Sequence, residues 1–290
     1  MIQTVLFLIL IVLSAASLAW ILLLSACLMI ARIRKKTSSK SLVSLKKTVV
    51  FFTAAMTLNV GLVILSQHIA FTPRIADENG DIPENSIAEL TELELNGRKQ
   101  WISIRGRDRN SPILLFLAGG PGGTQMAAVR HELEELEKHF VVVNWDQPGS
   151  GKSYYAERTK NITAQTYIRD GYALTEYLKD RFSQGKIYLL GESWGSALGI
   201  FLADMYPDSY HALIGTGQMV DFAETERIDY SKALEITQSK NDVALMNRLK
   251  ANGEPPYYGK DVTWKSAVYL NYLSAYMAGN PQILNPGYNT

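Results

Sequence analysis

The chain has 290 residues, 47% of them hydrophobic, and 29 lysines and arginines nearly balance 28 aspartates and glutamates. That length suffices for one large domain or two smaller ones. Residues 1–74 contain eight basic residues and no acidic one, so residues 75–290 hold 21 basic and 28 acidic residues. This acidic balance argues against nucleic-acid binding, and the single cysteine, Cys27, excludes a disulfide framework and a cysteine-based zinc site.

The first 74 residues have the pattern of a two-span membrane hairpin. No residue from Met1 to Ala31 is charged, and 16 of the 26 residues from Val5 to Ile30 are Leu, Ile, Val or Phe. A helix needs about 20 apolar residues to cross a bilayer. A cleaved signal peptide is disfavoured because the chain begins without a basic segment and the apolar run is too long. We therefore predict one span at about residues 5–31.

A second run, Thr48 to Phe71, holds 24 residues without Lys, Arg, Asp or Glu. It predicts a span at about residues 48–71. The segment between the spans, residues 32–47, carries seven positive charges and no negative one. Short basic loops stay in the cytoplasm, so the hairpin predicts a multi-pass protein of the cell membrane whose residues 75–290 are extracytoplasmic. The lipid bilayer is the first predicted partner, and the basic loop can also attract anionic headgroups.

Residues 75–89 are polar and rich in turn formers, which predicts a linker. Beyond it, short apolar runs alternate with helical patterns up to about residue 220, and Asn96-Gly97 predicts a two-residue hairpin turn. Such alternation indicates an α/β domain, residues 90–220, with a mostly parallel sheet and helices on both faces. The predicted strands are 90–95, 101–104, 113–117, 140–143, 187–190 and 212–214, and the predicted helices are 125–138, 163–182 and 196–206.

The alternation stops near Asp221, and residues 221–290 predict a helical cap that runs to the end of the chain. Its expected helices cover about 225–238, 242–250 and 261–277. This segment is rich in tyrosine, which more often packs a small helical core than lines a pocket.

The strongest chemical motif is Gly191-Glu192-Ser193-Trp194-Gly195, which lies between a predicted strand and a predicted helix. G-x-S-x-G in that context is a nucleophile turn, in which a sharp bend exposes the serine hydroxyl. Its glycines are needed because a Cβ would clash in so tight a turn. The alternative is a chance match, which the flanking strand and helix disfavour.

Two further motifs also follow predicted strands. Ala118-Gly119-Gly120-Pro121-Gly122-Gly123 is a glycine-rich loop that lets the backbone approach a substrate oxygen, although taken alone it fits a plain flexible turn. Residues 146–153 read D-Q-P-G-S-G-K-S. Their Gly-Lys-Ser ending suggests a phosphate-binding loop, but that loop needs glycine where Asp146 stands. We therefore reject nucleotide binding.

Together the motifs A-G-G-P-G, D-Q-P-G-S-G-K-S and G-E-S-W-G resemble the proline iminopeptidase family of serine peptidases within the α/β-hydrolase superfamily. That family has H-G-G-P-G, D-Q-R-G-x-G-x-S and G-x-S-W-G in the same order, followed by a helical cap. The likeness covers about residues 90–215 and, more loosely, the cap. Ala118 replaces the loop histidine and Pro148 an arginine, so the resemblance does not fix the peptidase specificity.

The resemblance implies a serine hydrolase with the α/β-hydrolase fold. Ser193 would be the nucleophile, and the N–H groups of Trp194 and Gly120, or less favourably Gly119, would form the oxyanion hole. The expected substrates are peptides with a free N-terminal residue or small esters and amides. A carboxylate in the cap would bind the substrate amine, with Glu224 and Glu226 as candidates. No metal or organic cofactor is implied, and no oligomeric state.

The remaining triad members are not evident. In this fold the acid and the histidine follow the serine, yet the only histidine after Ser193 is His211, at the far end of the next predicted strand. His131 and His139 precede the serine, and we interpret all three as surface or packing residues. We therefore expect the catalytic acid and base to lie beyond Thr290 and this chain alone to be nearly inactive. The alternatives are a carboxylesterase or lipase, and a catalytically dead membrane-tethered binding module.

Overall fold

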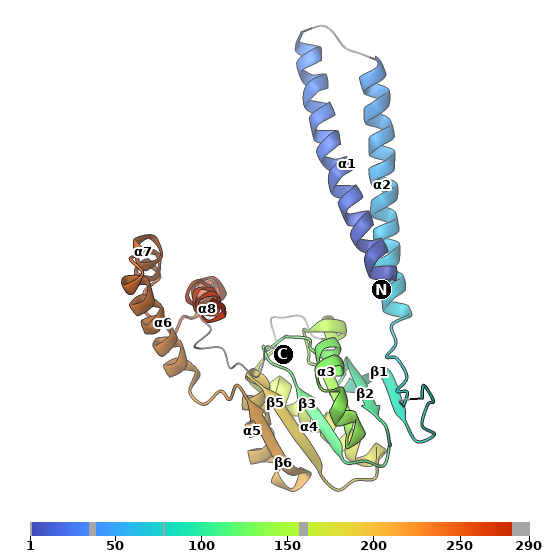
Figure 1. Ribbon diagram of the computed structural model, residues 1–290, viewed down its shortest axis with the longest axis vertical. Coiled ribbons are helices and arrows are strands. Elements are labelled where there is room, and N and C mark those ends of the chain that lie inside the picture. The colour runs from blue at the N-terminus through green and yellow to red at the C-terminus, as the bar shows by residue number, and fades with distance from the viewer. Residues whose placement is uncertain (1, 35–38, 78, 157–161, 280–290) are drawn as a thin grey trace. The chain divides into compact units, whose positions relative to one another are not determined.

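The computed structural model describes residues 2–34, 39–77, 79–156 and 162–279 (Figure 1). Residues 280–290 of the predicted cap lie outside the described residues, and so do Lys35 and Lys36 of the basic loop. The chain divides into two compact units, residues 1–74 with 88–90 and the remainder.

The N-terminal unit is a helical hairpin of α1 (Ile2–Ile33) and α2 (Ser39–His68), which lie side by side in Figure 1. By length and composition, Val5–Ile33 and Ser39–Ser66 could each cross a membrane. Helix α2 begins nine residues before the predicted span because lysine is a good helix former, and its charge opposes burial in lipid rather than helix formation. The described side chains buried between the two helices are small or polar: Ser14, Ser17, Ala55 and Asn59.

The described part of the second unit contains one six-stranded sheet with the strand order β1-β2-β4-β3-β5-β6. The Asn96-Gly97 turn joins β1 to β2, and both turn residues have positive φ angles of 50° and 78°, as predicted for this dipeptide. Strands β3, β4, β5 and β6 run parallel, and β2 pairs antiparallel with β4. The strands are β1 (Ile87–Leu95), β2 (Arg98–Gly106), β3 (Ile113–Leu117), β4 (Val141–Asp146), β5 (Ile187–Glu192) and β6 (Tyr210–Thr216).

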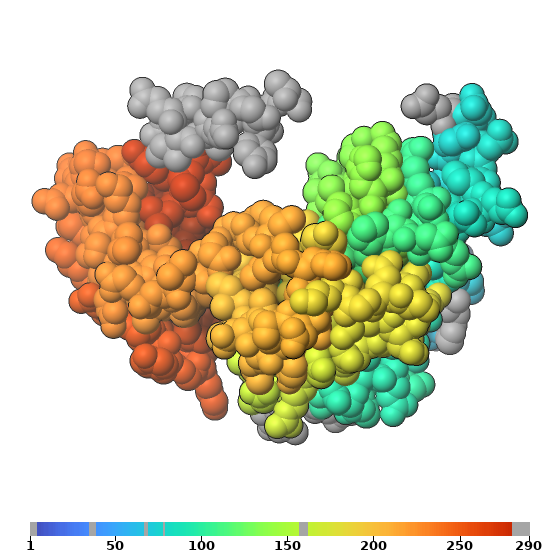
Figure 2. All heavy atoms as spheres, turned by 90° about the horizontal axis from the view of Figure 1, so that it is seen from below, coloured from blue at the N-terminus to red at the C-terminus, as the bar shows by residue number. Residues whose placement is uncertain are grey.

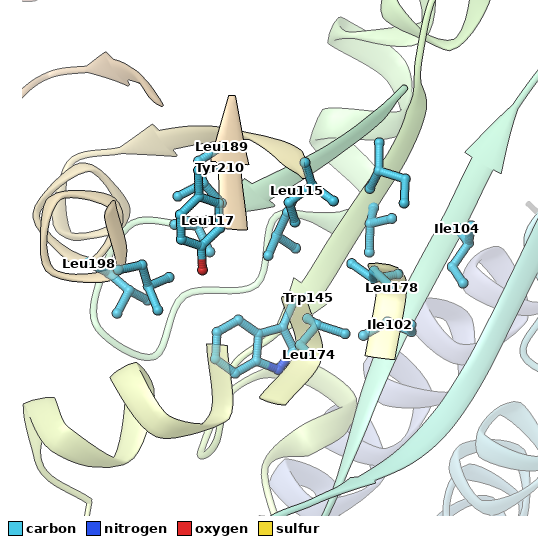
Figure 3. Close-up of a cluster of buried hydrophobic side chains, with 14 of the residues drawn as sticks. Ile102, Ile104, Leu115, Leu117, Trp145, Leu174, Leu178, Leu189, Leu198 and Tyr210 are labelled. Atoms are coloured by element: carbon cyan, nitrogen blue, oxygen red, sulfur yellow. The ribbon is translucent and has the colours of Figure 1, made fainter. Parts of the chain in front are cut away.

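Helices cover both faces of the sheet, as the buried strands predict. Alternate side chains of the central strands, such as Leu115 and Leu189, pack with Leu174 of α4 (Ala164–Arg181) and Leu198 of α5 (Trp194–Met205). Figure 3 shows Trp145 beside Leu174 in this core. The intervening side chains, such as Leu114, Phe116 and Val142, pack against Val129 of α3 (Met126–Glu132).

Most predicted helices and strands are present with small shifts at their ends. Thr163 caps α4, accepting a hydrogen bond from the backbone N–H of Thr166. The single helix predicted over 125–138 is wrong, because the helix changes at Leu133 into a 3₁₀ helix, η1 (Glu134–Lys138). Further 3₁₀ turns are η2 (Gly151–Ser153), η3 (Pro207–Ser209) and η4 (Gly259–Asp261).

Strand β6 forms one edge of the sheet. It is longer than predicted, and most of its side chains are exposed, including half of Ile214. On α5, Ile200, Phe201 and Met205 are also exposed. In Figure 2 the yellow and light-orange segment that contains α5 and β6 lies at the surface. This edge of the sheet therefore carries apolar side chains that the described residues leave uncovered.

The last described helices are α6 (Phe222–Ser239), α7 (Val243–Asn252) and α8 (Val262–Ala278). They share a small core of their own, built from Tyr230, Ala233, Leu249 and Tyr269. Asp221 and Asp242 cap α6 and α7, each accepting a hydrogen bond from a backbone N–H of the first turn. The prediction that the tyrosines of this segment pack a helical core is confirmed for Tyr230 and Tyr269.

Candidate active site

The nucleophile turn connects β5 directly to α5. Ser193 lies between Glu192, the last residue of the strand, and Trp194, the first of the helix, with φ 51° and ψ −118°. A side-chain-bearing residue rarely adopts a positive φ, and such strain occurs at functional sites. The glycines are required as predicted. A Cβ on Gly191 would lie 2.4 Å from the Gly195 carbonyl oxygen, and one on Gly195 would lie 1.8 Å from that of Leu117.

The backbone of Ser193 is anchored while its side chain is exposed. The Ser193 N–H donates to the Thr216 carbonyl at 2.9 Å, and the Ser196 hydroxyl donates to the Ser193 carbonyl at 2.5 Å. Within the described part of the chain, no group hydrogen-bonds to Ser193 Oγ. The strained turn therefore presents the hydroxyl to solvent, at the carboxyl edge of the parallel strands.

The glycine-rich loop lies beside this turn because β3 pairs with β5, which places Leu117 opposite Gly191. A Cβ built on Gly119 would lie 3.4 Å from Ser193 Cβ. The Gly119 N–H donates to Gln125 Oε1 at 3.1 Å, so it is already occupied. By contrast, the N–H groups of Gly120 and Trp194 find no acceptor among the described residues. Of the three N–H groups named from the sequence, these two are the ones that the described residues leave without an acceptor.

Two glutamines brace the loop against the turn. Gln125, which accepts from Gly119, also donates through Nε2 to the carboxylate of Glu192. The fully buried Gln147 donates to the Ala118 carbonyl at 3.1 Å and accepts from Trp194 Nε1 at 3.2 Å. Sequence reasoning missed both roles, since no local pattern shows which distant backbone groups an amide will reach.

Asp146 fixes the third motif to the glycine-rich loop. Its buried carboxylate accepts hydrogen bonds from Thr124 Oγ1 at 2.6 Å and from the Lys152 N–H at 2.8 Å. Burial raises the pKa of Asp146, and these two hydrogen bonds oppose the rise. Asp146 thus holds the Gly-Lys-Ser segment by its backbone.

This part of the chain is similar in sequence to known hydrolases. Residues 112–252 match the model of the alpha/beta hydrolase fold family. The second unit has the α/β-hydrolase fold. Among curated proteins, a probable aminopeptidase, YbaC, of Bacillus subtilis (strain 168) is 40% identical over 178 residues, which are 61% of this chain and 56% of that protein.

A proline iminopeptidase of Lactobacillus crispatus (strain ST1) is 33% identical over 121 residues, covering 41% of this chain and 40% of that protein. The chain thus spans about half the length of the curated relatives it matches. Among solved structures, a proline iminopeptidase-related protein from Thermus thermophilus has a TM-score of 0.45 at 23% identity, covering 51% of this chain and 50% of that one. These relatives are hydrolases by name.

The described histidines of the α/β-hydrolase domain lie away from Ser193. His211 is the second residue of β6, next to Ala212, which pairs with Tyr188, whereas Thr216 at the other end of the strand pairs with Glu192. At about 3.3 Å per residue, His211 is roughly 16 Å along the sheet from the nucleophile turn. Its ring packs 4.9 Å from that of Tyr188. His131 is exposed beside Glu132, and His139 is exposed after η1. None of the three contacts the nucleophile.

The two carboxylates named in the helical segment have different surroundings. Glu224 is exposed and pairs with Arg227 at 3.2 Å. Glu226 is buried, and its Oε1 accepts from Ser266 Oγ at 3.0 Å and from Tyr269 OH at 2.8 Å. Burial raises the pKa of Tyr269, so its hydroxyl stays protonated and continues to donate. Glu226 Oε2 has no hydrogen-bond partner in the described part of the chain. Of the two carboxylates, Glu226 is the one whose buried oxygen lacks a hydrogen-bond donor among the described residues.

Proposed function

We propose that this protein is a serine hydrolase of aminopeptidase type in which Ser193 is the nucleophile. The observation that carries the proposal is the strained, exposed Ser193 at the strand-to-helix turn, with the unoccupied N–H groups of Gly120 and Trp194 beside it. A nucleophile next to preorganised donors is the arrangement that acyl transfer requires. The names of the curated relatives favour a peptide substrate.

In the proposed reaction, Ser193 Oγ attacks the carbonyl carbon of the scissile bond and transfers its proton to a general base. The oxygen of the tetrahedral intermediate accepts hydrogen bonds from the N–H groups of Gly120 and Trp194. The protonated base then donates to the leaving amine, and water hydrolyses the acyl-enzyme by the same steps. Since none of the described histidines contacts Ser193, we assign the base to a group outside the described residues.

We further propose that Glu226 binds the free amino group of the substrate. Its buried, unpartnered Oε2 supports this role, because a buried carboxylate oxygen without a donor is costly and an ammonium group would satisfy it. A peptide with a blocked N-terminus would leave that oxygen unsatisfied and would be a poor substrate.

We propose that α1 and α2 anchor the protein in the cell membrane, with the hydrolase domain on the extracytoplasmic side. Only 11% of either apolar window is buried, whereas a core helix of a soluble protein would be mostly buried. The basic residues at the end of α1, between the helices and at the start of α2 favour a cytoplasmic loop. Reporter fusions inserted at Ser39 test the sidedness: a reporter there is expected to be active in the cytoplasm, and an externally active one overturns the topology.

The substrate proposal is tested with proline p-nitroanilide and its N-acetylated form. Protein isolated from its native membrane is expected to hydrolyse the free form at least tenfold faster than the acetylated form. Glu226→Gln is expected to reduce that preference, while the exposed Glu224→Gln leaves it unchanged. Equal turnover of both forms by the unsubstituted protein would contradict the aminopeptidase assignment, and turnover of p-nitrophenyl esters alone would indicate an esterase.

A second candidate is a membrane-tethered binding module that keeps the fold without catalysis. The observation that favours it is that His131, His139 and His211 all lie away from Ser193. Protein from the native membrane that hydrolyses neither anilide nor ester, yet retains its fold, would support this candidate over the first.

A further inference from the structure

A groove lies between α1 and α2 at the end of the hairpin where the basic segment connects them. Its volume is about 530 Å³, and it is lined by Leu28, Met29 and Arg32 of α1 and by Leu42 of α2. Cavities of about 300–1,000 Å³ are the size at which proteins bind small molecules. The groove therefore combines an apolar wall with one guanidinium group.

The lining residues are arranged by helical periodicity. Leu28 and Arg32 are four residues apart on α1, so they occupy the same face one turn apart. Met29 and Leu42 are largely exposed, at 63% and 45%. An exposed apolar wall ending in a guanidinium group matches an acyl chain that ends in a phosphate, because arginine binds phosphate oxygens bidentately.

The charge around the groove has one sign. Residues 1–74 contain no acidic residue, so neither helix of the hairpin supplies a carboxylate that could neutralise Arg32. Lys46 is four residues after Leu42 on α2, and therefore lies one turn further along the same helix face. The cytoplasmic leaflet, where we place this end of the hairpin, is the leaflet that carries anionic lipids.

We propose that this groove is a binding site for one anionic phospholipid, with the phosphate on Arg32 and an acyl chain against Leu28, Met29 and Leu42. This inference rests on the membrane hairpin proposed above and is independent of the proposed hydrolase activity. It differs from diffuse attraction by a basic loop, because it assigns the lipid to one arginine and one apolar wall.

The test uses the full chain, purified in detergent, delipidated, and titrated with phosphatidylglycerol or with phosphatidylcholine of the same acyl chains. Native mass spectrometry counts the bound lipids. One phosphatidylglycerol is expected to bind at least tenfold more tightly than phosphatidylcholine. Millimolar inorganic phosphate is expected not to displace it, because phosphate lacks the acyl chain. Equal binding of both lipids, or displacement by phosphate, would overturn the proposal.

Two pairs of variants distinguish specific lipid binding in the groove from nonspecific attraction of anionic lipid to basic residues. Arg32→Gln is expected to weaken phosphatidylglycerol binding about tenfold or more, whereas Arg34→Gln, which removes the same charge outside the groove, costs about fivefold or less, the effect of one basic residue at an anionic surface. Leu42→Trp is expected to fill the groove and abolish binding with the charge intact, while Val43→Trp next to it has little effect. Equal losses within both pairs would overturn the site.

A last control distinguishes failure of the lipid site from failure of the hairpin. Carbonate extraction of native membranes is expected to leave the protein in the membrane. Extraction into the soluble fraction would overturn both the hairpin and the lipid site, whereas membrane retention without selectivity for phosphatidylglycerol would overturn the lipid site alone. Circular dichroism confirms that each variant keeps its helical content.

Discussion

The nucleophile turn at the end of β5 and the neighbouring edge strand β6 differ in how completely their groups are partnered. Around Ser193, neighbouring segments converge, and Gln125, Gln147 and Asp146 connect them through buried or half-buried hydrogen bonds. Along β6, most side chains are exposed, and Ile214 contacts solvent with half its surface. The two regions are only one strand apart.

This difference suggests that the nucleophile and the oxyanion donors are a self-contained structure, whereas the base is not. Residues 113–125, 141–153 and 187–196 supply the side-chain hydrogen bonds from Gln125, Gln147 and Asp146, and β6 adds one backbone bond, from the Ser193 N–H to the Thr216 carbonyl. No described histidine approaches Ser193, and the open edge at β6 is a place where further polypeptide could pair.

The largest expected effect concerns activity. Because no described histidine contacts Ser193, residues 1–290 alone should turn over proline p-nitroanilide more slowly than the proline iminopeptidase of Lactobacillus crispatus. The expected factor is on the order of 10⁶, the cost of losing the histidine of a serine protease triad. A coupled absorbance assay of both proteins measures the ratio. A rate within tenfold of the relative would mean that a base exists in the chain, and His211→Ala would then be the first variant to examine.

The next effect concerns the nucleophile turn itself. Gly195→Ala would place a Cβ 1.8 Å from the Leu117 carbonyl oxygen, so we expect the free energy of unfolding to fall by about 3 kcal/mol or more. Gly185→Ala is the matched control, because a Cβ there has no neighbour within 4 Å, and it should change the value by less than about 1 kcal/mol. Urea unfolding measures both, and equal effects would show that the turn is not tightly packed.

A smaller loss of stability is expected when the hydrogen bonds of Gln147 to the loop and the turn are removed. Gln147→Leu leaves the Ala118 carbonyl and Trp194 Nε1 without their partner, at a cost of about 1–3 kcal/mol for each buried polar group left unsatisfied. Gln238→Leu, at an exposed position of α6, should change stability by less than about 0.5 kcal/mol. Denaturant titrations that give similar values for the two would argue that Gln147 does not brace the site.

The smallest change is expected at the sheet edge. Because Ile214 is half exposed on β6, Ile214→Lys should alter the free energy of unfolding by less than about 0.5 kcal/mol while reducing binding of hydrophobic dyes and aggregation. Leu115→Ala, in the fully buried β3, should instead cost about 2–5 kcal/mol. A large loss of stability from Ile214→Lys would show that the edge is covered in solution.

Local patterns were sufficient for most elements of the fold. Ile113–Leu117 was predicted with the bounds that the structure has, because a run of five apolar residues between turn formers is typical of a buried strand. The break at Leu133 was not predictable from periodicity, since α- and 3₁₀-helical turns accept the same residues. The start of α2 was missed because its lysines resemble a loop in composition but form a helix.

The site was predictable where a motif fixes the backbone conformation. It was not predictable where tertiary contacts determine which polar groups have hydrogen-bond partners. Glycine spacing identified the Ser193 turn, since Gly191 and Gly195 occupy positions where a Cβ would clash with nearby backbone atoms. Occupation of the Gly119 N–H depends on the side chain of Gln125, and the different surroundings of Glu224 and Glu226 depend on packing against α8. No sequence spacing carries that information.

The central claim is that Ser193 is an activated nucleophile in the native protein. It is tested by treating native membranes with a fluorophosphonate probe and locating the adduct by peptide mass spectrometry. We predict an adduct on Ser193, loss of labelling in Ser193→Ala, and unchanged labelling in the exposed control Ser231→Ala. An adduct at another residue, or labelling that survives Ser193→Ala, would contradict the account.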